Sequence, residues 1–136
     1  MSVFPIRLLP NIDLREELER ITVEHEWSSG WIIMGIGSLS QVSLRFAGKE
    51  DVQILEGEWE ICSLSGTLCA DGAHLHMVVS DAGGQTLGGH VGYGNIIRTT
   101  GELIFGCSSK HHFSRQFDNQ TGYSELVVQE CTEPAC

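Results

Sequence analysis

The sequence predicts an α+β fold, mainly an antiparallel β-sheet with one principal flanking helix. Three observations predict it: sixteen of the 136 residues are glycine, short β-branched runs recur along the chain, and a single segment has clear helical spacing of apolar residues. A chain of this length forms one hydrophobic core. We therefore expect one domain over residues 1–130, followed by a C-terminal tail of residues 131–136.

The first strand and the helix are predicted near the N-terminus. Residues 3–9 read as an opening strand that ends at a proline. Asp13 with a glutamate three residues later is typical of a helix N-cap, and the helix is expected to run to about Glu26. Its apolar positions fall on one stripe, at Leu14, Leu18 and Ile21.

The middle of the chain predicts several strands. Residues 31–36 are wholly apolar, as in a buried strand, and residues 42–46 alternate like a half-exposed neighbour. A polar turn at 48–51 precedes two further strands at 52–55 and 59–68. The period-two pattern of the latter places one of its faces in the core.

Three histidines stand out in the next stretch. If residues 73–79 form a strand, His74 and His76 point to the same face, about 6–7 Å apart along the backbone. A glycine-rich turn at 81–84 would return the chain antiparallel and deliver His90 to the same place. The spacing therefore predicts a hairpin that brings three imidazoles together.

Three imidazoles without a fourth protein ligand are typical of an open metal site. Such a site suits zinc, although nickel, iron or cobalt accept the same ligands. The competing interpretation is that the histidines are ordinary core residues with satisfied hydrogen bonds. For three histidines at this spacing, we favour one divalent transition metal ion bound by His74, His76 and His90.

Residues 95–105 predict another strand, in which Glu102 stands among apolar neighbours. A carboxylate there could accept a hydrogen bond from a ligand histidine or act as a general acid or base. It could equally face solvent on an alternating strand.

The segment 108–122 is predicted to be a loop from its polar composition, and its histidines at 111 and 112 are expected to be solvated. Adjacent residues of an extended chain point in opposite directions, so this pair would chelate a metal poorly. Residues 123–129 predict the last strand.

Charge and cysteine content restrict the function. Eighteen acidic and eight basic residues give a net charge of −10, which opposes binding to nucleic acid or to an anionic membrane, and the basic residues form no cluster. Five cysteines without a C-x-x-C pair favour free thiols in a reducing compartment. The first ten residues are too short and too interrupted by proline for a signal peptide or membrane span. We expect a cytoplasmic protein.

Several stretches together resemble the PPC family, the plants and prokaryotes conserved domain also called DUF296. They follow one another over nearly the whole chain: residues 35–39 (GIGSL), residues 59–67 (WEICSLSGT), His74 and His76, residues 88–90 (GGH), Glu102, residues 113–115 (FSR) and residues 121–126 (TGYSEL).

The resemblance implies an antiparallel sheet with a flanking helix, a homotrimer and, as in bacterial and archaeal members, a metal at His74, His76 and His90. Plant members add AT-hook segments that hold the minor groove of DNA, and bacterial members often share the DNA-binding label. This chain has no Arg-Gly-Arg-Pro segment. The fold is also similar to that of acetolactate decarboxylase, a zinc enzyme with three histidine ligands.

These observations lead to three hypotheses. The first is a metal-binding homotrimer of bacterial type with a regulatory or small-ligand-binding role, its ligand a small anion at the metal. The second is a zinc-dependent lyase or hydrolase in which Glu102 moves protons and Arg115 holds an anionic substrate. The third, DNA binding, follows the family label and is opposed by the charge of the isolated protein.

Overall fold

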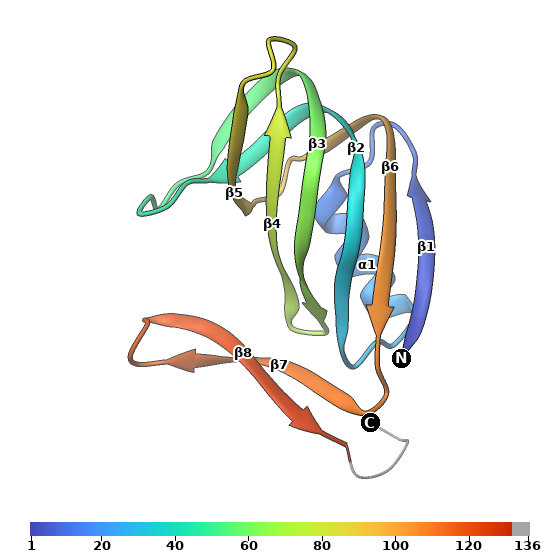
Figure 1. Cartoon of the computed structure of the whole chain (residues 1–136). Coiled ribbons are helices and arrows are strands. Elements are labelled where there is room, and N and C mark those ends of the chain that lie inside the picture. The colour runs from blue at the N-terminus through green and yellow to red at the C-terminus, as the bar shows by residue number, and fades with distance from the viewer. Residues whose placement is uncertain (132–136) are drawn as a thin grey trace.

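Eight strands and one helix make up residues 1–131, the part of the chain that the computed structural model describes. Six strands form an antiparallel sheet with the helix against one face, and the last two form a separate hairpin (Figure 1). The α+β prediction is confirmed. The elements in chain order are β1 (Ser2–Leu8), α1 (Leu14–Glu24), β2 (Gly30–Arg45), β3 (Gln53–Cys69), β4 (Gly72–Ser80), β5 (Thr86–Val91), β6 (Ile96–Cys107), β7 (His111–Asp118) and β8 (Tyr123–Glu130).

The helix begins at its predicted cap. Oδ1 of Asp13 accepts hydrogen bonds from the backbone N–H groups of Arg15 and Glu16, at 2.9 and 3.2 Å. These bonds satisfy two of the amides that have no partner within the helix itself. The apolar stripe of α1 is buried against the sheet, as the spacing predicted.

The sheet has the strand order β1-β6-β2-β3-β4-β5. The end of β2 also pairs with β5, through Leu44 with Val91 and Arg45 with His90. Strands β2, β3, β4 and β5 therefore close into a ring at this end of the sheet. The ring brings segments of distant sequence next to the histidine hairpin.

Four strands were expected in the middle of the chain, and the structure joins them in pairs into two long strands, β2 and β3. The stretches 31–36 and 42–46 both belong to β2, apart from residue 46, and 52–55 and 59–68 both belong to β3, apart from residue 52. The sequence breaks between them are accommodated by register shifts, including one between Leu39 and Gln41, so the strands bend without ending.

The prediction of a loop over residues 108–122 is wrong for most of that segment. Residues 111–118 form β7, which pairs with β8 along its whole length. The two strands satisfy each other's backbone hydrogen bonds, and no side chain of β7 is fully buried, so its composition resembles that of a loop. Of the expected tail, only Cys131 lies within the described residues.

The β7–β8 hairpin lies apart from the sheet in Figure 1 and is held near its base. The N–H of Phe113 donates to the carbonyl of Ser28 at 2.8 Å, and the N–H of Arg115 donates to Asp71 Oδ2 at 3.0 Å. The hairpin is thus fixed beside the turn between β3 and β4, next to the strand that carries two of the histidines.

The two faces of the sheet differ. Side chains such as Leu75, Met77 and Phe105 are buried on the face that α1 covers. Their neighbours along the strands point the other way, and among these Ile36 and Val78 are exposed to 45% and 40%. The sheet therefore presents a partly apolar outer face.

Cys62, Cys69 and Cys107 are free thiols as expected, whereas Cys131 is disulfide-bonded, in contrast to the expectation of free thiols throughout. In residues 1–131, no helix has both the length and the apolar character needed to cross a membrane.

Candidate metal centre

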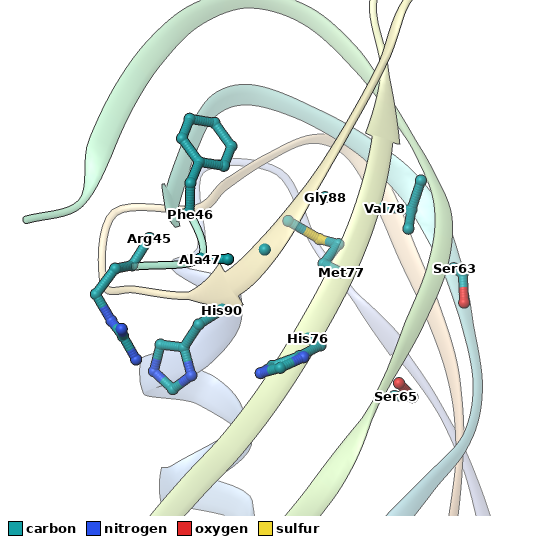
Figure 2. Close-up of a pocket in the computed structure, with 11 residues that line it drawn as sticks. Arg45, Phe46, Ala47, Ser63, Ser65, His76, Met77, Val78, Gly88 and His90 are labelled. Carbon is teal, nitrogen blue, oxygen red and sulfur yellow. The ribbon is translucent and has the colours of Figure 1, made fainter. Parts of the chain in front are cut away.

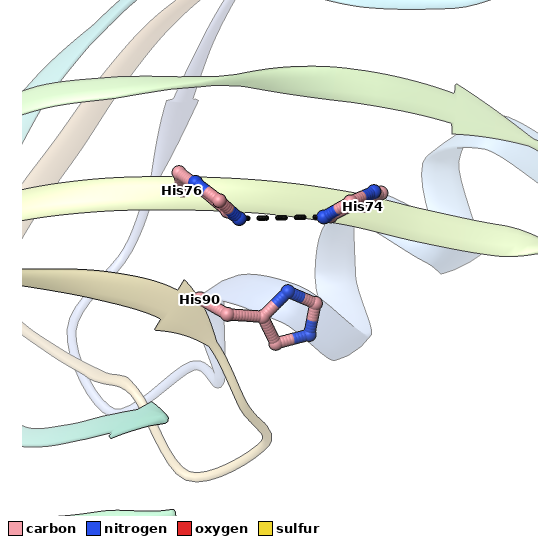
Figure 3. Close-up of side chains that lie close together, drawn as sticks. All are labelled: His74, His76 and His90. Atoms are coloured by element: carbon pink, nitrogen blue, oxygen red, sulfur yellow. Dashed lines mark hydrogen bonds between the residues drawn. The ribbon is translucent and has the colours of Figure 1, made fainter. Parts of the chain in front are cut away.

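Neighbouring strands β4 and β5 carry the three histidines. His74 and His76 alternate with the buried residues Ala73 and Leu75, so their rings project from the outer face of the sheet. His90 lies directly opposite His76 in the β4–β5 register. The structure brings together the three histidines that the sequence singled out, and Figure 3 shows their rings turned toward one another.

The ring nitrogens are close enough to share one ion. One nitrogen from each ring lies within 4.8 Å of the others, and Nε2 of His74 is 3.3 Å from Nε2 of His76. Two imidazoles on a tetrahedral zinc ion, with Zn–N bonds of about 2.0–2.1 Å, place their nitrogens about 3.3–3.4 Å apart. The separation therefore fits zinc without rearrangement of these two rings.

His90 supplies an independent test of this fit. Its Nδ1 is buried and has no hydrogen-bond partner among the described residues. In Figure 3, this nitrogen is on the side of the ring that faces His74 and His76. Leaving a buried polar atom unpaired costs about 1–3 kcal/mol, and a metal ion held by the three rings would remove that cost.

A glycine on β3 permits the close approach of β4 at the first histidine. Gly66 has φ of +150°, and a Cβ there would lie only 2.1 Å from the carbonyl oxygen of His74. Any other residue would push the two backbones apart. The position of His74 therefore depends on the absence of a side chain at Gly66.

Arg15 of α1 holds the two histidine strands together from the other side. Its guanidinium donates to the carbonyl of Val91 on β5 at 2.8 Å and to that of Ala73 on β4 at 3.0 Å. Each carbonyl belongs to a residue next to a histidine. Glu19 pairs with Arg15 at 3.0 Å, and the ring of Tyr93 lies 4.5 Å below its guanidinium carbon, so the arginine is itself fixed in place.

Two further arginines lie beside the imidazoles. Nη1 of Arg115 is 3.5 Å from Nδ1 of His74, and Nη2 donates to Thr67 Oγ1 at 2.6 Å. Arg45 is paired in register with His90, and Figure 2 shows its guanidinium beside the ring. Two guanidinium groups therefore flank the histidine cluster.

Burial and these charges keep two imidazoles neutral. Burial lowers the pKa of His90 to about 4, and the charges of His74 and Arg45 add to the effect. Burial also lowers the pKa of His74, with a smaller contribution from Arg115. Neutral imidazole is the form that binds a metal, so both rings are ready to act as ligands at neutral pH.

Two hollows reach the histidines. The first, which we call the arginine hollow, has a volume of about 420 Å³, and the second, the glycine hollow, about 410 Å³ (Figure 2). Both volumes are within the range of small-molecule sites. The arginine hollow is lined by residues that include Arg15, Arg45, Asp71, His74, Arg115 and Glu125. The glycine hollow is lined by residues that include Phe46, Ser63, Met77, Val78, Gly88 and Gly89.

Glu102 does not join this site within one chain. It lies on β6, which β2 and β3 separate from β4, and three strand spacings amount to about 14 Å. Its side chain is exposed on the outer face and lines a different hollow together with Arg7 and Met34. Of the two residues predicted to assist chemistry, the structure places Arg115 beside the histidines and Glu102 away from them.

Sequence reasoning missed Arg15 and Arg45. Arg15 stands on the wet side of a helical pattern, where an arginine is usually solvated. Arg45 reaches His90 because of the short β2–β5 pairing, which joins residues far apart in the chain. No local pattern predicts either contact.

Fold and site together define a class of protein: an antiparallel sheet with one helix and a candidate three-histidine metal centre on two neighbouring strands. The chain belongs to the plants and prokaryotes conserved domain family, whose model matches residues 1–108. The resemblance inferred from the sequence is thereby confirmed. The match ends just before the β7–β8 hairpin.

Solved structures share the fold. A hypothetical protein from Salmonella is 40% identical, with a TM-score of 0.92 over 95% of this chain and 94% of the other. A metal-containing protein from Archaeoglobus fulgidus is 23% identical, with a TM-score of 0.75 over 93% and 94% of the two chains. A protein from Bacteroides thetaiotaomicron with a provisional DNA-binding label is 23% identical, with a TM-score of 0.83 over 92% and 91%. At 23% identity, the last two show likeness of fold alone.

Curated relatives extend far beyond this chain. The bifunctional protein GlmU of Synechococcus sp. (strain JA-2-3B'a(2-13)) is 43% identical over all 136 residues. That match covers 22% of the relative, so the chain spans about a fifth of its length.

Proposed function

We propose that this protein binds one divalent transition metal ion, with zinc as the first choice, through His74, His76 and His90, and that it binds a small anionic ligand at the metal in a regulatory or sensing role. The observation that carries the proposal is the buried, unpartnered Nδ1 of His90 facing two other ring nitrogens. Three imidazole ligands would leave a position open on a tetrahedral ion. The neighbouring arginines favour an anion at that position.

The proposal is tested by metal analysis. Purified wild type should retain about one metal ion per chain after dialysis, and His76→Ala should retain far less, because two imidazoles bind zinc much more weakly than three. His112→Gln is the matched control, since this histidine lies on β7, outside the cluster. Equal metal content in wild type and His76→Ala would exclude the assignment.

We further propose that the protein forms a homotrimer, with the outer face of the sheet in the interface. Exposed apolar residues on that face, Ile36 among them, gain from being covered by another copy. Light scattering at micromolar concentration should give three times the chain mass. A monomer mass would contradict this assembly.

A zinc-dependent lyase or hydrolase is the alternative. Arg115 is in position to hold an anionic substrate beside the metal, which supports this alternative. The position of Glu102 on a distant strand deprives the single chain of the proton carrier that the hypothesis assigned. We therefore rank ligand binding above catalysis.

In the curated relatives, the region similar to this chain is part of a much longer protein, and this fits a regulatory role. In the relative from Synechococcus sp. (strain JA-2-3B'a(2-13)), a region similar to this chain accounts for 22% of a protein named as bifunctional. A small ligand-binding domain attached to a larger protein can pass on its state of occupancy through contacts between the two.

We do not extend the proposal to DNA. A net charge of −10 opposes the approach of a polyanion, and phosphate contacts need several clustered lysines or arginines. Saturable, salt-sensitive binding of the isolated protein to an AT-rich duplex would reverse this ranking.

A further inference from the structure

Arg45 and Arg115 are kept free of carboxylate partners in an acidic protein. The chain has eighteen acidic residues, yet the arginine ion pairs found in residues 1–131 are formed by Arg15, Arg20 and Arg98, and none by Arg45, Arg115 or the distant Arg7 on β1. Arg45 donates one bond, to the carbonyl of Lys49, and Arg115 keeps donors beyond its bond to Thr67. Both line the arginine hollow. An external anion is the partner that their charges lack.

Acidic groups in the same hollow limit the charge of that anion. Asp71 and Glu125 line it, and the charge of Glu125 reaches His74. A phosphate dianion would meet these carboxylates, whereas a carboxylate brings a single negative charge. The planar guanidinium of Arg115 also matches the two oxygens of a carboxylate. The hollow therefore suits a monocarboxylate better than a phosphate.

The glycine hollow adds space for an apolar group. Its lining includes the side chains of Phe46, Met77 and Val78. It also includes Gly88, which has no side chain, and a Cβ there would lie 3.3 Å from Val78 Cγ2. Both hollows share Arg45 and His90, so one small molecule can occupy the two at once. A volume of about 410 Å³ accommodates a chain of several carbons.

We infer that the ligand is a small monocarboxylate with a short aliphatic tail. Its carboxylate lies between Arg115 and the open position of the metal, and its tail lies over Gly88 in the glycine hollow. This inference rests on the proposed function, since it uses the metal as one of the two groups that hold the carboxylate.

Calorimetric titration of the zinc-loaded wild type with acetate, propionate, butyrate and pentanoate tests the inference. Affinity should rise about fourfold with each methylene that the glycine hollow buries. Pentanamide, which has the tail without the charge, and inorganic phosphate should each bind more weakly than pentanoate. Equal affinity for acetate and pentanoate, or a preference for phosphate, would overturn the assignment.

Two variants separate the head of the ligand from its tail. Arg115→Gln should weaken all four carboxylates at least about tenfold, because it removes a charge-assisted bond, while Arg98→Gln, in an exposed ion pair, leaves them unchanged. Gly88→Ala should reduce the gain from acetate to pentanoate and preserve acetate binding. Gly83→Ala in the turn, with an equally tight 3.3 Å contact, should preserve the whole series.

Metal content measured on each sample distinguishes failure of the proposed metal site from failure of the inferred ligand class. If wild type fails to load zinc, the proposed function and this inference fall together. If zinc loads and carboxylates bind without dependence on tail length or on Arg115, the ligand class is wrong and the metal site stands.

Discussion

The two hairpins of the molecule, β4–β5 and β7–β8, have similar local structure and different surroundings. The first is paired on both sides, by β3 along β4 and by β2 at the end of β5. The second pairs only within itself in the described part of the chain. A strand pair that is bonded to neighbouring strands can hold three histidine side chains at fixed distances from one another. A strand pair without such neighbours is positioned only by the contacts at its base. The histidines are on the hairpin that has neighbours.

The largest expected effect comes from adding a methyl group where β3 meets β4. Gly66→Ala should lower the free energy of unfolding by at least about 3 kcal/mol, because the new Cβ meets a backbone oxygen and φ is unfavourable. Gly122→Ala between β7 and β8 also has positive φ but meets nothing within 4 Å, so about 1 kcal/mol is expected. Urea denaturation measures both. An equal loss of unfolding free energy in the two variants would show that the backbone contact at Gly66 contributes nothing beyond the unfavourable φ.

An intermediate effect is expected from removing the bridge behind the histidines. Arg15→Met should weaken zinc binding by about 10–100-fold, since the carbonyls of Ala73 and Val91 lose their shared donor and the two strands shift. Competition with a chromophoric chelator measures the affinity. Arg20→Met, on the exposed side of the same helix, is the control. Unchanged affinity in Arg15→Met would mean that strand pairing alone sets the geometry.

The smallest effect concerns the pH dependence of the metal-free protein. Because the pKa of His90 is about 4 when folded and about 6.5 when unfolded, the unfolded state binds more protons between these values. The free energy of unfolding should therefore fall as pH drops from about 6.5 to about 4. Denaturation at pH 7 and pH 5 measures the fall, which His90→Gln should reduce and His112→Gln, on the other hairpin, should leave intact.

What the sequence predicted depends on how local the signal is. The cap at Asp13 and the common face of His74 and His76 follow from spacings of two or three residues, and the structure has both. The pairing that places Arg45 opposite His90 joins positions 45 residues apart, and Arg15 reaches strands farther still along the chain. Such contacts depend on the whole topology. Metal binding by the grouped histidines stays a prediction.

The sequence pattern did not predict strand β7, for a related reason. Its alternation of polar and apolar side chains is weak because neither of its faces is fully buried. Burial on one face is what produces a clear period of two in a sequence. A hairpin that stands away from the core leaves little of that pattern to detect.

The ring formed where β2 pairs with β5 also limits how another chain can reach the histidines. At His90 the strand already has partners on both sides, β4 and β2, so no strand of another protein can be added to the sheet there. The opposite edge, β1, contains Pro5, which lacks the N–H that strand addition uses. A partner that responds to occupancy of the site therefore reaches it either through side chains of the outer face or through the β7–β8 hairpin, whose outer strand edges pair with no other strand in the described residues.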